Sequence, residues 1–361
     1  MSVIIKTLKA FNRKLDAISV GGAVFFTKRK WVKIVARKTT KSLSKEQKAQ
    51  CKNFYKPYFK LNTCFHTFYT EKTGLYDSRY IPDDIYYGKI DRFFNNYKMA
   101  AVLDNKCFYP RMFGNICKQA ENVAYRLNGY WYNRDMAPVS ELTIMTELNS
   151  FDELVVKLAT DSFGGHGVEF IKGTDKTINE QLHKLVTQHS NDIVIQLPIQ
   201  QHSKMAELHQ ESINTIRVLS FLSKEGEVKI YSVIVRMGVG TARVDNASSG
   251  GITCGVEQDG TLKKCAYSPN GTCFEKHPTT GVCFDQICIP GYQSVLDSVK
   301  KMHSLIPHFR IASWDMAVDQ EGEAVLIEVN LRAGELDFHQ LNNGPLFGDD
   351  TKNILDEVFG N

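Results

Sequence analysis

Several features that would place this chain in a membrane or an exported class are missing from its sequence. No run approaches the roughly 18 apolar residues that a membrane-spanning helix needs. The longest candidate, from Ala17 to Phe26, is about half that length and contains Gly21 and Gly22. The start of the chain also lacks a small-residue cleavage site of the kind that ends a secretory signal. These absences predict neither a transmembrane nor an exported protein.

Closely spaced cysteine pairs are also missing. The nine cysteines are an odd number, which, without a signal peptide, indicates reduced thiols in a cytosolic compartment. Cys265, Cys273, His277, Cys283 and Cys288 form a cluster that suggests zinc, but none of its cysteine pairs has the C-x-x-C spacing of structural zinc sites. Ordinary loop or hairpin cysteines are therefore the favoured interpretation, with a metal site as the alternative.

Acidic residues are scarce at the start of the chain. Residues 1–60 contain 16 Lys and Arg against two acids, which leaves 28 basic and 38 acidic residues in the remainder. Such a basic segment, interleaved with aromatic side chains, is typical of a solvated helical leader, a membrane-surface contact or a nucleic-acid contact. The body of the chain has no recognisable nucleic-acid motif. We therefore favour the solvated leader, followed by contact with an anionic membrane.

The rest of the composition is that of a globular protein. With 361 residues, 43% apolar and 23% charged, the chain is expected to form about two domains. Residues 1–60 are predicted to be helical, with Ser42 and Ser44 as caps, and residues 61–100 to be irregular with short helices. From residue 101 onward, strand-like runs alternate with a few helices. This alternation predicts a mixed α+β architecture.

The strand-like runs are joined by recognisable turns. Asp259-Gly260 and Gln320-Glu321-Gly322 predict hairpins, so we expect an antiparallel sheet with helices packed against it in the C-terminal half. The predicted strands cover residues 153–159, 167–172, 192–197, 215–223, 227–236, 252–257, 262–267, 312–319 and 324–330. The predicted helices cover residues 178–189 and 292–305.

One candidate site combines a strand lysine with a glycine-rich turn. Lys157 precedes the sequence Phe163-Gly164-Gly165-His166-Gly167. Glycines let backbone N–H groups approach anionic oxygens, and the lysine neutralises charge, so the pattern suits nucleotide phosphates. It is neither a Walker A sequence nor a Rossmann fingerprint. Taken alone, an ordinary glycine turn is the commoner explanation.

A second candidate site consists of oxygen-bearing side chains on two predicted strands. Glu328 and Asn330 are two residues apart and share one strand face, and pairing across the Gly322 turn can place Asp315 beside them. Two carboxylates and an amide oxygen suit magnesium held together with phosphates. The alternative is an exposed polar strand face.

A third candidate site contains two arginines. Arg217 and Arg236 lie on neighbouring predicted strands, and the polar segments Val244–Asn246 and Ser248–Gly251 follow. Guanidinium groups on adjacent strands can clamp a phosphate or an oxyanion. The alternative for each arginine is a salt bridge at a sheet edge.

The order of these elements resembles that of the ATP-grasp superfamily, and more closely that of the sugar-transfer-associated ATP-grasp family. The family pattern contains NTIRV, R-x-G, VDN followed by SGG, HP-x-TG, WD and E-x-N. In this chain the motifs lie at Asn214–Val218, Arg236–Gly238, Val244–Asn246 with Ser249–Gly251, His277–Gly281, Trp314–Asp315 and Glu328–Asn330. The resemblance covers roughly residues 100–345, and no motif identifies residues 1–100.

The resemblance implies an ATP-grasp fold, in which two α+β lobes enclose a nucleotide cleft. It places the first lobe, with the glycine-rich hairpin, at residues 101–200 and the second lobe, with the metal site, at residues 201–361. Residues 1–100 form a basic, mostly helical region before them. The implied nucleotide-binding residues are Lys106, Lys157, Gly164, Gly165, Gly167, Gln196, Leu197 and His202.

These nucleotide-binding residues have different implied roles. Lys106 and Lys157 match the two lysines that bind the nucleotide, and the three glycines match the loop that closes over the triphosphate. Gln196 and Leu197 fall at the hinge that meets adenine, where the family commonly has an acid. His202 is a candidate near the ribose.

The remaining implied roles concern the metal and the acceptor. Asp315, Glu328 and Asn330 match magnesium ligands, and Arg217 and Arg236 match the groups that face the γ-phosphate and the acyl phosphate. The acceptor loop is matched by Asp245, Asn246, Gly250 and Gly251, of which Asn246 is a candidate catalytic residue. His277 matches a family position without an assigned role, and we favour a structural turn there.

The resemblance implies an ATP- and Mg²⁺-dependent carboxylate–amine ligase that acts through an acylphosphate. The substrates are expected to be a sugar acid or an amino acid and an amine, in bacterial polysaccharide biosynthesis. Two alternatives are an ATP-grasp kinase that phosphorylates a hydroxyl and a non-catalytic nucleotide-binding protein at a membrane. We expect a cytoplasmic protein that contacts the inner face of the cell membrane, if at all, through residues 1–60.

Overall fold

The computed structural model describes residues 33–160, 167–173, 178–188, 192–246, 249–332 and 334–360. The chain forms two compact units. The first unit contains residues up to 96 together with 270–272 and 335–361, and the second contains residues 97–269 and 273–334. The three-part division that the sequence suggests stays a prediction.

Helices make up the first unit. The described part begins with a short helical segment at residues 33–38. The helices that follow are α2 (Lys45–Tyr55), α3 (Cys64–Thr73), α4 (Asp83–Ile85), the π-helical turn η1 (Tyr86–Ile90), α5 (Asp91–Phe94), α12 (Leu336–Asn343), the 3₁₀ turn η5 (Gly348–Asp350) and α13 (Thr351–Phe359). Of the two predicted caps, Ser44 is the one that begins a helix: it forms a reciprocal capping box with Gln47 at the start of α2.

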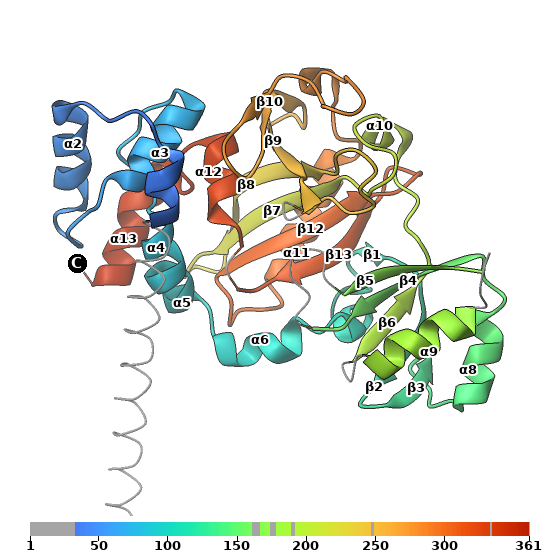
Figure 1. Ribbon diagram of the computed structural model, residues 1–361. Coiled ribbons are helices and arrows are strands. Elements are labelled where there is room, and N and C mark those ends of the chain that lie inside the picture. The colour runs from blue at the N-terminus through green and yellow to red at the C-terminus, as the bar shows by residue number, and fades with distance from the viewer. Residues whose placement is uncertain are drawn as a thin grey trace, which may run out of the picture. The chain divides into compact units, whose positions relative to one another are not determined.

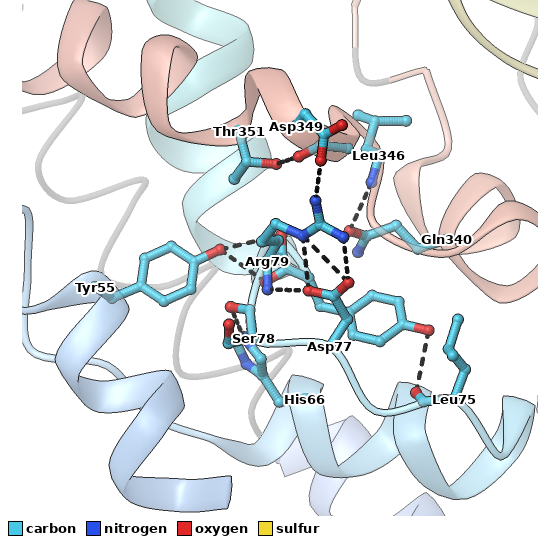
Figure 2. A network of polar contacts seen from close by, with 12 residues as sticks. Tyr55, His66, Leu75, Asp77, Ser78, Arg79, Gln340, Leu346, Asp349 and Thr351 are labelled. Carbon is cyan, nitrogen blue, oxygen red and sulfur yellow. Dashed lines mark hydrogen bonds and ion pairs between the residues drawn. The ribbon is translucent and has the colours of Figure 1, made fainter.

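A polar network joins the C-terminal helices of the first unit to its N-terminal part (Figure 2). The Gln340 side chain accepts a hydrogen bond from the Ile81 N–H and donates one to the Ile81 carbonyl, at 2.8 and 2.9 Å. Arg79 contacts Asp77 and Asp349, and Tyr55 donates to the Tyr80 carbonyl at 2.8 Å. Buried backbone groups need such partners, so these contacts place α12 in the first unit although 259 residues separate Gln340 from Ile81.

The second unit contains two sheets, and the smaller one has five strands in the order β3-β2-β6-β4-β5. The strands are β2 (Asn122–Leu127), β3 (Tyr130–Asn133), β4 (Glu153–Leu158), β5 (Val168–Lys172) and β6 (Ile193–Gln196). Helices α8 (Glu141–Leu148) and α9 (Ile178–Gln188) lie beside this sheet in Figure 1. Leu154 and Val156 of β4, Ile193 and Ile195 of β6 and Leu182 of α9 belong to one buried apolar cluster.

The larger sheet has eight strands in the order β1-β13-β12-β7-β8-β9-β10-β11. The strands are β1 (Lys118–Gln119), β7 (Thr215–Leu222), β8 (Val228–Met237), β9 (Ile252–Val256), β10 (Leu262–Tyr267), β11 (Cys273–Phe274), β12 (Ile311–Val318) and β13 (Ala324–Asn330). Helix α11 (Tyr292–His303) supplies Val295, Val299 and Met302 to the main apolar core. The short helices of this unit are α6 (Tyr97–Leu103), η2 (Lys106–Phe108), α7 (Tyr109–Phe113), α10 (Ser203–Ala206) and η4 (Phe284–Gln286).

The predicted strands from residue 153 onward are confirmed, with ends that shift by at most one residue. Both expected hairpins are present: β9 pairs with β10, and β12 pairs with β13 in antiparallel register. Elements that were not predicted include helix α8, the short strand β11, the β2–β3 hairpin and strand β1. The β2–β3 hairpin turns at Asn128 and Gly129, both with positive φ, and β1 adds to the large sheet in parallel with β13. The mixed helix and sheet architecture is as expected.

Candidate functional site

The register of the eight-stranded sheet places polar side chains from five strands on one face. Asp315 lies opposite Glu328 on one side and opposite Arg217 on the other. Arg236 pairs with Thr215, two residues from Arg217, and with Thr253 on β9. Because directly paired residues, and residues two apart on one strand, share a face, these side chains point the same way. We call this set the polar face; its members are Thr215, Arg217, Arg236, Thr253, Asp315, Glu328 and Asn330.

Asp315 stands at the centre of the polar face as a buried charge. Arg217 donates from Nε to Oδ1 and from its terminal nitrogen to Oδ2, both at 2.7 Å, which is the bidentate geometry of a strong ion pair. Arg236 adds a contact to Oδ2 at 3.3 Å and Asn330 one at 3.4 Å. Burial alone would raise the pKa of Asp315, but these two arginines hold it below its ordinary value. The carboxyl is therefore charged at neutral pH.

Arg236 connects the polar face to the loop that follows β8. Its terminal nitrogen donates to Oδ1 of Asn246 at 2.5 Å and lies 3.5 Å from a carboxylate oxygen of Asp245. Gly251 closes this loop, with its N–H on the Asn246 carbonyl. A Cβ at Gly251 would lie 2.3 Å from the Asp245 carbonyl oxygen, so only glycine allows this close approach. The loop thereby brings Asn246 to the same guanidinium group that faces Asp315.

Lys106 and Glu328 meet at the edge of the polar face. The backbone N–H of Lys106 donates to the Ala159 carbonyl, directly after β4. Its Nζ lies 3.0 Å from Oε1 of Glu328, and the lysine side chain is 6% exposed against 24% for the glutamate. This contact ties the end of β4 in the small sheet to β13 in the large sheet.

The ion pair between Arg332 and Asp104, next to these residues, was not predicted from the sequence. Arg332 lies 3.2 Å from Asp104. Burial raises the pKa of Asp104 to about 6, with Arg332 opposing the shift and Glu328 adding to it. Each partner stands two residues from a predicted site residue, Asp104 before Lys106 and Arg332 after Asn330, but no local pattern indicates that the two side chains meet. Both partners border the candidate site.

Lys157 lies on the face of the small sheet that is not packed against α8 and α9. It pairs with Val168 and Val194, whereas Val156 and Leu158 beside it belong to or pack against the apolar cluster on the other face. Burial and repulsion from Lys106 lower the pKa of Lys157 to about 8, and attraction to Glu328 opposes them. Lys157 is therefore electrostatically coupled to both members of the Lys106–Glu328 pair.

The glycine-rich hairpin is described only in part. Gly167 has a φ of 82°, and a Cβ there would lie 2.5 Å from Leu158, so this position requires glycine. Its carbonyl accepts a hydrogen bond from the Leu158 N–H at 2.9 Å. The nucleotide-loop residues Gly164 and Gly165 lie outside the described residues, and their role stays a prediction.

The predicted adenine and ribose residues lie at and after the end of β6. The Gln196 side chain donates to Oδ1 of Asn122 at 2.8 Å, while its Oε1 is buried without a hydrogen-bond partner among the described residues. The Leu197 N–H donates to the Glu121 carbonyl. The Nδ1 atom of His202 caps α10 by accepting from the Lys204 N–H at 3.0 Å. Gln196 is thus the member of this group that offers an unused polar atom.

His277 holds backbone rather than a metal ion. Its Nε2 donates to the Gly238 carbonyl at 2.9 Å, and its Nδ1 accepts from the N–H groups of Thr279 and Thr280. Across the described part of the chain, no group of three or more His, Cys, Asp or Glu side chains is placed to hold a metal. The favoured structural interpretation of His277 agrees with this geometry.

A comparison with families of known proteins decides the assignment. The profile of the sugar-transfer associated ATP-grasp family matches residues 88–355. The chain belongs to the sugar-transfer-associated ATP-grasp family. The match extends from the π-helical turn of the first unit through both sheets into α13, so the resemblance that the motifs suggested is confirmed.

Searches of individual proteins give weaker likenesses. No curated protein matches the chain. Among solved structures, an N5-carboxyaminoimidazole ribonucleotide synthetase in complex with ADP has 14% identity and a TM-score of 0.38 over 63% of this chain and 45% of its own. A D-cycloserine synthetase has 10% identity and a TM-score of 0.45 over 73% of each chain. A D-alanine–D-alanine ligase from Bacillus anthracis with ATP has 14% identity and a TM-score of 0.40 over 74% and 68%.

The lengths also differ, since this chain spans less than half of the first of these structures. The family assignment therefore rests on the match over residues 88–355 and on the motifs within it. None of the described helices is long and apolar enough to cross a membrane.

Proposed function

We propose that this member of the family is an ATP-dependent carboxylate–amine ligase that acts through an acylphosphate. The observation that carries the proposal is the meeting of Lys106 and Glu328 at 3.0 Å, with Lys157 electrostatically coupled to both. The ammonium groups of Lys106 and Lys157 and the carboxylate of Glu328 on β13 are thereby brought close together. Phosphoryl transfer needs positioned charge of both kinds.

The nucleotide would lie along the small sheet. Lys106 and Lys157 supply positive charge for its phosphates, and Gly164, Gly165 and Gly167 supply the closely approaching backbone. The buried Oε1 atom of Gln196 has no hydrogen-bond partner among the residues that the structure describes. It can accept a hydrogen bond from the exocyclic amine of adenine, which relieves the cost of an unsatisfied buried acceptor. Leu197 and His202 complete the proposed adenine and ribose contacts.

The polar face would hold Mg²⁺ through Asp315, Glu328 and Asn330. Their carboxylate and amide oxygens are the hard ligands that Mg²⁺ prefers, and Lys106 occupies only one oxygen of Glu328. Both oxygens of Asp315 already accept hydrogen bonds from Arg217. Nucleotide phosphates would offer Arg217 alternative acceptors, so Asp315 can turn to the ion when the nucleotide binds. When bound, Mg²⁺ neutralises phosphate charge.

The reaction would transfer the γ-phosphoryl group of ATP to a substrate carboxylate, and an amine would then displace phosphate to form an amide. Arg217 would stabilise charge on the transferring phosphoryl group, while Arg236 and Asn246 would orient the acyl phosphate. The protein need not supply a general base for phosphoryl transfer, since the attacking carboxylate is already ionised. Exclusion of water protects the acylphosphate from hydrolysis.

The experiment that tests this proposal measures release of ADP and phosphate with candidate carboxylates and amines. The expected result is turnover that depends on both substrates. Conversion of ATP to AMP would contradict it. A hydroxyl-phosphorylating kinase is the main competitor, because the same residues would serve it. Trapping with hydroxylamine separates the two, since an acylphosphate yields a hydroxamate and a phosphate ester does not.

The substrates and the location are further parts of the proposal. We propose that the substrates are a sugar acid or an amino acid and an amine, in bacterial polysaccharide biosynthesis in the cytoplasm. The association of the family with sugar transfer supports the sugar-linked part of this proposal. Lys45, Lys48, Lys52 and Lys56 are spaced along α2 or directly after it and are not buried. Their charge supports contact of residues 1–60 with an anionic membrane. Salt-sensitive co-sedimentation with anionic vesicles, lost on removal of residues 1–60, is the test.

If the chain binds Mg·ATP but turns over none of these substrates, the competing interpretation is a nucleotide-binding protein without catalysis. A thermal-shift screen with Mg·ATP, sugar acids and amino acids reports binding independently of turnover. Stabilisation by a carboxylate only in the presence of nucleotide would favour the ligase.

A further inference from the structure

Residues 238–246, in the connection between β8 and β9, contact three other parts of the second unit. The first of these residues are fixed by side chains from two distant segments, the later ones contact Arg236, and Arg243 between them reaches the small sheet. We call residues 238–246 the bridging loop. Each of its three attachments is made by a different kind of interaction.

The first attachment holds the stem of the bridging loop. His277 donates to the Gly238 carbonyl and His209 donates to the Gly240 carbonyl, at 2.9 and 3.0 Å. The Gly240 N–H donates to the hydroxyl of Thr279 at 2.7 Å. Three backbone polar groups within three residues are therefore paired with side chains. A loop whose polar backbone groups are paired in this way is held in one conformation.

The second attachment is the one described above, in which Asn246 and Asp245 contact Arg236. Arg236 is itself bound to Asp315. A shift of the bridging loop therefore changes the position of a guanidinium group on the polar face.

The third attachment is made by Arg243. Its terminal nitrogen lies 2.7 Å from Oε1 of Glu153, at the start of β4. Its guanidinium carbon lies 3.8 Å from the ring centroid of Phe170 on β5, a cation–π distance. Glu153 is four residues before Lys157 on the same strand, and Phe170 pairs with Val155 between them. Arg243 therefore contacts the face of the small sheet that carries Lys157.

From this geometry we propose that Arg243 is a positioning residue that couples the nucleotide-binding sheet to Arg236. Nucleotide held at Lys157 would stabilise one placement of β4 and β5, and Arg243 would transmit that placement through the bridging loop to Asn246 and Arg236. The inference rests on the proposed function, because it assigns the nucleotide to the small sheet and the acyl phosphate to Arg236. It adds that the two sites are linked through one side chain.

The size of the effect follows from the exposure of the contact. Arg243 is 40% and Glu153 26% exposed, so this ion pair contributes little to the stability of the fold. The guanidinium–ring contact adds a second modest term. We therefore expect removal of Arg243 to leave the fold intact. It should reduce the slowing of amide exchange that Mg·ADP causes in the bridging loop by about threefold to tenfold.

The experiment is hydrogen exchange of the full chain with and without Mg·ADP. In the unchanged protein, Mg·ADP is expected to slow exchange of the backbone amides of residues 239–246. In Arg243→Met, binding of Mg·ADP persists within about threefold, but the slowing in residues 239–246 is largely lost. Phe170→Leu, which removes the ring and keeps the ion pair, is expected to show an intermediate loss.

Two controls make the test specific. Arg134→Met removes an exposed arginine of the same unit that lies 3.6 Å from Glu121, and should leave the slowing unchanged. The double exchange Arg243→Glu with Glu153→Arg restores an opposite-charge pair, and it is expected to recover part of the slowing that Arg243→Glu alone abolishes.

Equal slowing in the unchanged protein and Arg243→Met would overturn the inference while leaving the proposed function standing. Absence of any Mg·ADP binding by the unchanged protein would instead remove the proposed function and this inference with it. A loss of slowing in Arg134→Met equal to that in Arg243→Met would also overturn it, because the effect would then be general.

Discussion

Two buried aspartates, one in each compact unit, respond to burial in opposite ways. Asp315 in the second unit is 5% exposed and Asp83 in the first is 4% exposed. Burial raises the pKa of Asp83 well above its ordinary value, and the nearby carboxyl of Asp337 adds to the rise. At Asp315 the attraction of Arg217 and Arg236 outweighs burial, and its pKa is lowered.

The difference shows where the fold maintains charge. Asp83 accepts a hydrogen bond from the Tyr69 hydroxyl at 2.6 Å, as a neutral carboxyl can. Asp315 instead lies between two guanidinium groups that are themselves 5% and 6% exposed. A buried charge is costly unless it is paired, so the second unit spends stability on an ionised site. This contrast supports a functional role for the polar face and a structural one for Asp83.

Asp315→Asn should have the largest effect on this comparison. The substitution leaves Arg217 and Arg236 buried without a full counter-charge, for which we expect a loss of about 3–5 kcal/mol in the free energy of unfolding and no turnover. Urea denaturation and the ADP-release assay measure the two effects. Glu328→Gln, at a position that is 24% exposed, is the matched variant that should abolish turnover with a smaller loss of stability. Turnover retained in both variants would contradict the metal assignment.

Lys157 extends the comparison to a half-buried cation. Because its pKa is lowered to about 8, the ligand-free protein loses this charge as the pH rises through 8, while bound phosphates favour the protonated form. Affinity for Mg·ADP should therefore fall by up to about tenfold per pH unit above pH 8, as calorimetry from pH 7 to 9.5 would show.

Lys157→Arg provides the control for this pH dependence, because a guanidinium group stays charged throughout that range. The fall in affinity should be absent in this variant. Lys157→Met should bind weakly at every pH. If Lys157→Met binds Mg·ADP as tightly as the unchanged protein, Lys157 is only a strand residue.

The sequence predicted the parts of the fold that local pattern determines. Strands such as β7 and β12 are mostly apolar runs bounded by turns, and the Gly260 and Gly322 turns identify the β9–β10 and β12–β13 hairpins. The β2–β3 hairpin was missed although Asn128-Gly129 is a strong turn signal, because β3 has only four residues and β2 lacks a regular apolar–polar alternation. The parallel pairing of β1 with β13 joins residues 207 apart in number, such as Lys118 and Val325, and no local pattern indicates it.

The candidate site also has a part that local spacing predicts and a part that only the tertiary fold determines. Spacing on one hairpin predicts that Asp315, Glu328 and Asn330 share a face, and the register agrees. The pairing of Arg217 with Asp315 depends on β7 lying beside β12, 98 residues away. Contacts such as Arg243 with Glu153 and Arg332 with Asp104 involve single residues brought together by the tertiary fold. Residue types are readable from sequence, whereas these partners are not.

The hydrogen bonds of the neutral His277 side chain hold the stem of the bridging loop, which contacts Arg236 on the polar face. Its Nε2 donates to the Gly238 carbonyl, while its Nδ1 accepts from the N–H groups of Thr279 and Thr280. Two substitutions can therefore remove the donated and the accepted hydrogen bonds separately. His277→Gln can keep the donor and His277→Asn the acceptor. We expect His277→Asn to raise the KM for the acceptor about tenfold and to speed exchange of residues 238–246, and His277→Gln to do so less.

The pH dependence of this support has a definite sign. Burial lowers the pKa of His277, and His209 nearby adds to the lowering. Protonation of Nδ1 would place its N–H against two backbone N–H groups, so the attachment should weaken as the pH falls below the ordinary histidine range. Exchange of residues 238–246 that is independent of pH between 5 and 7, after correction for intrinsic rates, would contradict this account.

Asp83→Asn should have the smallest effect and sharpens the contrast with Asp315. Since the folded-state pKa of Asp83 is raised, the folded protein binds a proton more tightly than the unfolded chain, and stability falls as the pH rises above the unfolded value of about 3.9. Asparagine is neutral at all pH values and nearly isosteric.

We expect Asp83→Asn to change the stability of the first unit by less than about 1 kcal/mol at pH 5. At pH 8 the variant should be more stable than the unchanged protein. Hydrogen exchange, followed separately in each unit, measures this change in stability. Asp315 is the opposite case, because its lowered pKa stabilises the second unit above the unfolded-state pKa of about 3.9. That contribution is lost as the pH falls through the folded-state pKa of Asp315. A loss of stability in Asp83→Asn as large as that in Asp315→Asn would show that Asp83 is held as a charge too, and the distinction between the two units would fail.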